Sequence, residues 1–107
     1  LGPGALTGDD DPAMPLATSL AQNYPNPFNP ATTIRFDLKE DSKVMLSVYN
    51  VNGGLVATLV DRNMTAGRKE IRWEGRDGMG SPVSSGVYFY RMVAGDFVQT
   101  RKMVLMR

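Results

Sequence analysis

The sequence of 107 residues contains neither cysteine nor histidine. The first absence excludes disulfides, thiolate catalysis and cysteine metal sites. The second removes the usual general base at neutral pH and the commonest metal ligand. No apolar run approaches the roughly 20 residues that cross a bilayer, so we expect no membrane span. Together these absences argue against an enzyme and against a bound cofactor.

Neither sign of charge is in large excess, because 12 lysines and arginines are balanced by 11 aspartates and glutamates. The net charge of such a chain is too small to produce an electrostatic field that attracts nucleic acid, and we expect no nucleic-acid partner. The acidic run at 9–11 lacks the alternating ligand spacing of a calcium loop and is interpreted as a solvated tether. Ser84 and Ser85 have no histidine to activate them as nucleophiles.

No segment shows a helical period, and the character of the chain changes at Tyr24-Pro25-Asn26-Pro27-Phe28-Asn29-Pro30. Three prolines in seven residues remove three backbone donors, which excludes a helix or a central strand here. We interpret this stretch as a boundary that its two aromatic residues can pin onto the fold. Residues 1–22 are predicted to be an extended linker or leader, and residues 23–107 the globular domain. Because the chain begins at Leu1, we expect a processed product or a segment of a longer protein.

Apolar and polar residues alternate with a period of two from this boundary onward. Strands are predicted at 32–38, 43–51, 55–60, 68–74, 87–94 and 97–106, with a short one at Val83 and a longer loop at 61–67. The pattern predicts an all-β fold, an immunoglobulin-like antiparallel β-sandwich of about seven strands with an extended N-terminal leader. Apolar packing must hold the two sheets together, and the predicted core residues are Phe36, Leu46, Val48, Leu59, Ile71, Trp73, Val87, Phe89 and Val104.

Alternation along 87–94 places Phe89 inside and both neighbouring tyrosines, Tyr88 and Tyr90, outside. With Tyr49 they are predicted to form an exposed aromatic patch that could contact a partner.

The residues that follow Ala21-Gln22-Asn23, namely YPNPFNP and then Thr32-Thr33-Ile34-Arg35-Phe36, resemble the type A C-terminal sorting domain of type IX secretion cargo. They are also similar to the immunoglobulin-like domain of flagellar hook-capping proteins. The resemblance covers about residues 20–107 and continues through Val48-Tyr49-Asn50-Val51, Ala66-Gly67, Trp73, Gly75-Arg76-Asp77, Ser85-Gly86-Val87-Tyr88 and Lys102-Met103-Val104-Leu105-Met106-Arg107. It departs at Asn52-Gly53-Gly54, where the family often has an apolar residue, then glycine, then a long polar residue.

This resemblance implies a non-catalytic module that directs secretion and cell-surface attachment of a passenger protein. The implied partners are the secretion translocon and a surface peptidase, with the cleavage region in residues 1–22. The implied location is extracellular or the outer-membrane surface. The residues that match the sorting motif are Pro25, Asn26, Pro27, Gly86, Tyr88, Lys102, Val104, Leu105 and Arg107.

Two other functions stay open at this point. An extracellular filament subunit could self-assemble into a homopolymer by N-terminal strand donation, with Met14, Leu16 and Leu20 in a neighbour's groove. An accessory binding domain of a larger secreted enzyme would use the outer tyrosines.

Overall fold

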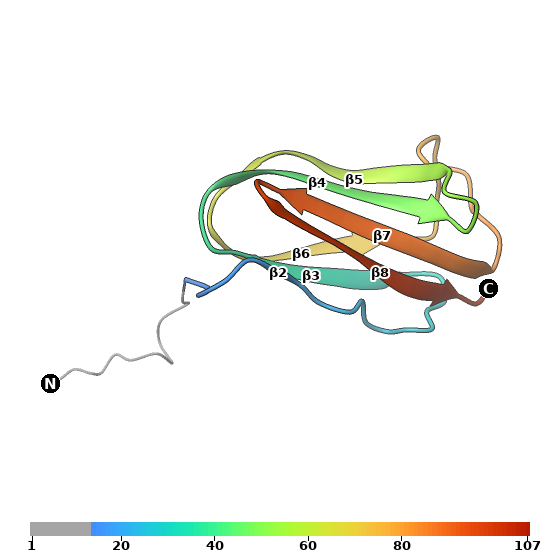
Figure 1. Cartoon of the computed structure of the whole chain (residues 1–107). Helices are drawn as coiled ribbons and strands as arrows, with labels where there is room; N and C mark the ends of the chain where they lie inside the picture. Colours follow the sequence, from blue (N-terminus) through green and yellow to red (C-terminus); the bar gives the residue numbers. More distant parts are fainter. Residues whose placement is uncertain (1–13) are drawn as a thin grey trace, which may run out of the picture.

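The computed structural model describes residues 14–107, and the acidic run at 9–11 lies outside them. The described chain forms two antiparallel sheets that pack face to face (Figure 1). One sheet has the order β2-β3-β6, formed by Ser19–Leu20, Thr32–Leu38 and Gly67–Trp73. The other has the order β5-β4-β7-β8, formed by Leu55–Met64, Ser42–Asn50, Gly86–Ala94 and Phe97–Leu105. The predicted all-β sandwich of about seven strands is confirmed.

β5 is longer than the sequence predicts. Residues 61–63 pair with residues 43–45 of β4, so the predicted loop at 61–67 is wrong. β5 is an edge strand, and polar side chains on such a strand can face water while the backbone pairs. Val83 forms no strand, and an isolated bridge between Arg76 and Pro82 lies beside it. Within residues 14–107 there is no helix long and apolar enough to cross a membrane.

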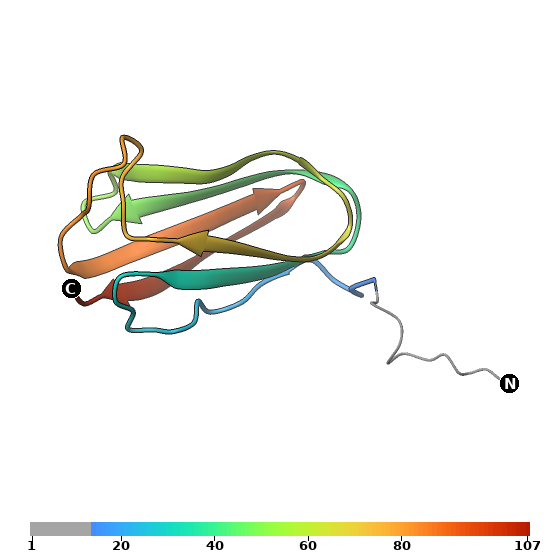
Figure 2. The same ribbon diagram turned by 180° about the vertical axis from the view of Figure 1, so that it is seen from behind.

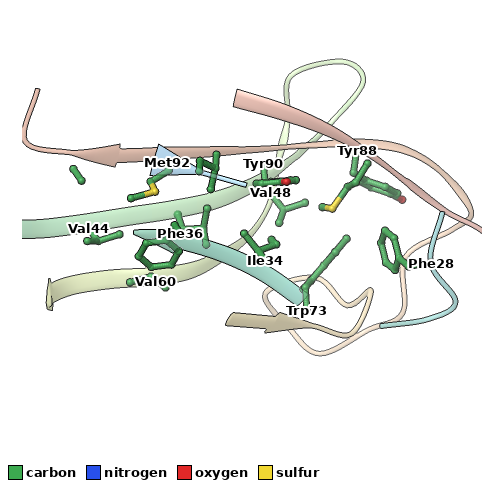
Figure 3. Packing of buried hydrophobic residues seen from close by; sticks show 14 of the residues in the cluster. Phe28, Ile34, Phe36, Val44, Val48, Val60, Trp73, Tyr88, Tyr90 and Met92 are labelled. Atoms are coloured by element: carbon green, nitrogen blue, oxygen red, sulfur yellow. The ribbon is translucent and has the colours of Figure 1, made fainter. Parts of the chain in front are cut away.

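The core lies between the sheets and includes a cluster of three aromatic rings (Figure 3). Trp73 is 3% exposed, as predicted, and its ring centroid lies 5.7 Å from that of Phe28 and 5.6 Å from that of Tyr88. Each such pair adds about 0.5–1.5 kcal/mol beyond simple burial. Phe28 therefore pins the proline-rich stretch onto the core, as predicted, whereas Tyr24 is 71% exposed and does not.

The predicted orientation of β7 is wrong. Tyr88 and Tyr90 point into the core, and Val87 and Phe89 are half-buried on the outer face. Both hydroxyls donate to backbone carbonyls at 2.7 Å, Tyr88 to Ser84 and Tyr90 to Ala21. Because these acceptors offset the cost of burying a phenol, the tyrosines can line the core. The predicted outer patch of three tyrosines is therefore absent from the described sheet.

β8 follows the orientation of β7, since directly opposed residues face the same side of a sheet. Met103 pairs with Tyr88 and points inward, so the predicted core residue Val104 points outward. The predicted core residues of β3 and β4, Phe36, Leu46 and Val48, are fully buried.

Two other predicted core residues, Leu59 and Ile71, pack against the core but stay partly exposed. A register shift between β4 and β5 leaves Leu59 without a pairing partner in β4.

The first described strand lies within the segment that the sequence assigns to the leader. β2 pairs Ser19 with Asp37 and Leu20 with Phe36 of β3. Leu20 is 2% exposed and belongs to the core cluster, whereas Met14 and Leu16 are 59% and 93% exposed. Of the three residues predicted for strand donation, Leu20 thus fills the core of its own domain.

Candidate functional site

The proline-rich stretch crosses from one sheet to the other. It leaves the three-stranded sheet at Tyr24, which bridges Thr33 through hydrogen bonds of 3.0 and 2.9 Å. It reaches the four-stranded sheet at Phe28, whose amide donates to the Val104 carbonyl at 2.9 Å and whose carbonyl accepts from the Met106 amide at 2.8 Å. In Figure 1 this segment, in light blue, runs toward the end of the molecule at which the C-terminus lies. Phe28 is therefore a one-residue parallel extension of the sheet beyond β8.

Two side chains extend this cover along β8. Asn26 Oδ1 accepts from the Val104 amide at 2.9 Å, and Gln22 Nε2 donates to the Lys102 carbonyl at 2.7 Å. Residues 102, 104 and 106 all point their backbone groups toward the outer edge of β8, and each now has a partner there. An unpaired edge is a template for association with another strand, and these contacts close its C-terminal half. We call the contacts between residues 22–28 and 102–107 the C-terminal latch.

A buried polar network holds the start of the latch. The Tyr90 hydroxyl accepts from the Asn23 amide at 2.8 Å and donates to the Ala21 carbonyl at 2.7 Å. The Asn23 side chain donates to Thr32 Oγ1 at 2.9 Å and to the Pro25 carbonyl at 3.2 Å. Within residues 14–107 no buried side-chain nitrogen or oxygen lacks a partner. Burial raises the pKa of Tyr90 to about 12, against the opposing effects of the Asn23 hydrogen bond and of the nearby Arg101 charge.

The last residue is fixed at the other end of the latch. The Arg107 amide donates to Ser85 Oγ at 2.7 Å, and its guanidinium donates to the carbonyls of Val83 and Gly75, each at 2.6 Å. Gly75 has a φ of +69° and lies so close that a Cβ there would be 2.8 Å from Arg107 Nη2. The planar guanidinium presents several donors in a fixed geometry, which suits two carbonyls at once.

The structure brings most of the predicted sorting residues together. Asn26, which stands between Pro25 and Pro27 in the chain, contacts Val104, and the neighbouring Phe28 bridges Leu105. The Lys102 carbonyl accepts from Gln22, and Arg107 is bound to Gly75, Val83 and Ser85. In β7, Gly86 pairs with Leu105, and Tyr88 pairs with Met103. The predicted strand-donation residues do not join this site, because Met14 and Leu16 are exposed ahead of β2 and Leu20 lies in the core.

Sequence reasoning missed four residues that hold the latch: Gln22, Asn23, Phe28 as a pairing residue, and Tyr90. Gln22 and Asn23 fall in the predicted leader or at its border, and their partners in β7 and β8 are 67–80 positions away. Local periodicity carries no signal for such contacts. A buried asparagine in a turn-rich segment can be recognised only when its partners are known.

The latch consists of backbone groups, amides, hydroxyls and one guanidinium. Residues 14–107 contain no group of three carboxylates that could hold a metal ion. Ser85 Oγ accepts a hydrogen bond from the Arg107 amide. Outside the latch, on the exposed surface, the Lys69 ammonium donates to Thr65 Oγ1 at 3.1 Å. The arrangement is suited to holding a strand edge and to presenting a surface. It supplies no activated nucleophile.

Comparison with known proteins agrees with this architecture. The FlgD Ig-like domain family matches residues 26–96. No curated protein matches the chain. Among solved structures, the chain is similar to dimeric latent PorU from Porphyromonas gingivalis, with a TM-score of 0.67 and 22% identity over 81% of this chain.

Two further structures share the fold. PorZ, a bacterial surface component of the type IX secretion system of P. gingivalis, has a TM-score of 0.57 and 21% identity over 80% of this chain. FlgD from P. aeruginosa has a TM-score of 0.55 and 20% identity over 71%. The chain spans only 9% of the PorU structure, 11% of the PorZ structure and 64% of the FlgD structure. The predicted immunoglobulin-like β-sandwich is confirmed.

Proposed function

The chain belongs to the FlgD Ig-like domain family, and we propose that it is a non-catalytic C-terminal module for secretion and cell-surface attachment of a passenger protein. The proposal places it in the type IX pathway, as a sorting domain of type A, with an extracellular or outer-membrane surface location. The observation that carries it is the C-terminal latch, which gathers the sorting-motif residues from both ends of the domain. Its partners would be the secretion translocon and a surface peptidase.

The latch favours recognition of a folded surface over recognition of a linear tail. Leu105 is 1% exposed, and Val104 and Met106 pair with the proline-rich segment. A receptor therefore meets the C-terminal residues together with Asn26 and the prolines on either side of it. The signal would be composite, made of residues that are about 80 positions apart in the chain.

A surface peptidase would act ahead of the domain. Leu16 is 93% exposed and Met14 is 59% exposed, and both precede the first described strand. Cleavage within residues 1–22 but before Ser19 would leave all seven described strands intact. The fold shared with PorZ, a surface component of a type IX system, supports a place in that pathway.

A reporter fused ahead of residues 1–107 tests this proposal in a bacterium that has a type IX secretion system. The full domain is expected to bring the reporter to the cell surface or the medium. Removal of residues 101–107 is expected to leave it in the periplasm, because the latch loses one of its two sides. Arg62→Ala, an exposed change on β5 away from the latch, is the matched control and is expected to export normally.

Export of the shortened domain at the level of the full domain would contradict the proposal. The full domain can also be compared between this host and an isogenic strain that lacks the type IX translocon. Retention in the host combined with export in the strain without the translocon would also contradict the proposal.

The alternative of a filament subunit assembled by strand donation is less favoured, because Leu20 would have to leave the core of its own domain. Light scattering on residues 1–107, with and without residues 1–18, tests this alternative directly. Large assemblies that disappear on truncation would support the filament and displace the sorting role. The accessory-domain alternative loses its predicted surface, since Tyr88 and Tyr90 are buried.

A further inference from the structure

The outer faces of the two sheets differ in chemistry. On the three-stranded sheet the outward residues of β3 and β6 are mostly charged, and Arg35 pairs there with Glu70 at 2.8 Å. On the four-stranded sheet the outward positions of β7 are Val87, Phe89, Arg91 and Val93, of which only one is charged. A solvated sheet face normally carries polar residues at these positions. Figures 1 and 2 show the two sheets as separate layers of the sandwich.

Opposed residues on neighbouring strands extend this surface as two rows, with the polar row of Ser47, Arg91 and Thr100 between them. Phe89 lies between Tyr49 of β4 and Lys102 of β8, and Val93 lies between Met45 and Val98. Met45 is 40% exposed and Val98 is 52% exposed, so the surface is open. No described residue of the chain covers it.

A shallow hollow of about 410 Å³ lies on this face. Tyr49 and Phe89 supply its two aromatic rings, and Val51, which is 64% exposed, lies at its margin with the hairpin that joins β4 to β5. Arg91 and Thr100 line its other side. Its volume is within the range of sites that accept a small ligand or a single large side chain.

Charge on this face indicates what occupies the hollow. Among the described residues, Arg35, Lys43, Arg68 and Arg72 each have a carboxylate within 4.0 Å. The other eight lysines and arginines have none within residues 14–107, and Arg91 and Lys102 are the two of them that are exposed on this sheet face. Lys102 of β8 lies directly opposite Phe89 of β7. Arg91 comes two positions after Phe89 in β7 and therefore faces the same side of the sheet. A carboxylate placed next to a ring in the hollow would therefore meet two cations.

We propose that this face binds an extended peptide segment of a partner protein, in which a carboxylate side chain lies two positions after an aromatic one, because alternate residues of an extended segment face the same side. The aromatic side chain enters the hollow between Tyr49 and Phe89, and the carboxylate lies between Arg91 and Lys102. A second copy of the chain fits less well, because the outward positions of this sheet offer a single carboxylate, Asp61, which already pairs with Lys43. The hollow is on the sheet face and the latch is at the sheet edge, but Lys102 takes part in both, through its carbonyl in the latch and its side chain on the face. The test therefore changes Arg91, which takes no part in the latch.

The test uses the purified full chain, labelled with ¹⁵N, and three synthetic peptides. The first is acetyl-Gly-Ser-Phe-Ser-Asp-Gly-amide, the second has Asn in place of Asp, and the third has Ala in place of Phe. Amide shifts are expected at Tyr49, Phe89, Arg91 and Thr100, with a dissociation constant near 1 mM, as for a small, open site. The Asn peptide is expected to bind about three- to fivefold more weakly, as for loss of one exposed charge contact.

Arg91→Gln should remove most of the discrimination between the Asp and Asn peptides. Arg62→Gln should preserve it, because Arg62 pairs with the inward-facing Val44 and lies on the other side of the sheet. Arg91 is exposed, so the variant is expected to fold, and the melting temperature of each variant verifies this.

Equal binding of the Asp and Asn peptides would overturn the proposal, as would shifts that avoid the hollow. Self-association of the chain through this face would also overturn it, as would binding to phosphatidylglycerol vesicles without binding to the peptides. Each of these results leaves the export experiment unaffected.

Discussion

The Tyr90 hydroxyl holds the start of the latch through two hydrogen bonds, and Tyr90→Phe removes it with little change in packing volume. The hydroxyl satisfies the Asn23 amide and the Ala21 carbonyl at 2.8 and 2.7 Å. Tyr90 is fully buried, with 0% of its surface exposed, so water cannot replace the lost bonds without disturbing the core. Each buried polar group left without a partner costs about 1–3 kcal/mol. We expect Tyr90→Phe to lower the free energy of unfolding by about 2–4 kcal/mol.

Urea unfolding followed by tryptophan fluorescence measures this loss, because Trp73 is the only tryptophan and is buried in the same core. For a domain of this size, the melting temperature should fall by about 10 °C or more. Tyr24→Phe is the matched control. Tyr24 is 71% exposed, and its change should stay within about 0.5 kcal/mol. Tyr88→Phe, which loses a single hydrogen bond to Ser84, should fall between the two.

A loss below about 0.5 kcal/mol for Tyr90→Phe would refute this reasoning, since it would mean that the hydroxyl does not hold residues 21–23 against the sandwich. A Tyr88→Phe variant less stable than Tyr90→Phe would refute the ranking that the hydrogen bonds predict.

Three further predictions concern the same region. The pKa of Tyr90 is about 12 in the fold and about 10 in the unfolded chain, so stability from this group is complete below pH 10. It is lost as the pH rises from 10 to 12, by up to roughly 3 kcal/mol. Urea melts at several pH values should show this fall in the wild type but not in Tyr90→Phe. Arg107→Ala should cost about 1–2 kcal/mol by urea unfolding, with Arg107→Lys recovering only part, and full stability of the alanine variant would refute the contacts to two carbonyls. Gly75→Ala should lower the melting temperature more than Gly80→Ala. Both glycines have a positive φ, but only Gly75 lies against Arg107 and Pro30. Equal losses would count against the close approach of Arg107 and Pro30 to Gly75.

The sequence pattern predicts most of the sandwich, because alternation identifies strands whose two faces differ in polarity. β3 shows this best, with Ile34, Phe36 and Leu38 buried and Arg35 exposed. The orientation of β7 could not be predicted in the same way. Both of its faces are apolar, so either phase agrees with the pattern, and the choice depends on carbonyl acceptors near the tyrosine hydroxyls.

The length of β5 was missed for a related reason. Residues 61–63 are polar and resemble a loop, but an edge strand tolerates polar side chains while its backbone pairs. Strand pairing to β4 therefore decides a boundary that composition alone misplaces.

The candidate site was predictable in its residues but not in its geometry. The proline-rich stretch and the C-terminal strand each carry a local signature, and the sequence predicts the first as a boundary pinned by an aromatic residue. Their contact joins Asn26 to Val104 across 78 positions. No local rule yields a pairing of that separation, and the hydrogen bonds of Gln22 and Asn23 depend on it.

Export of a reporter fused to the Asn26→Ala domain tests the composite signal most directly. This change removes the 2.9 Å contact to the Val104 amide and leaves residues 101–107 unaltered. The variant should remain folded, with a loss of about 1 kcal/mol that thermal unfolding can verify. Export of the variant is expected to fall several-fold below that of the wild-type domain and of the Arg62→Ala control. Export at the wild-type level would contradict it, because the C-terminal tail would then act without the segment that covers it.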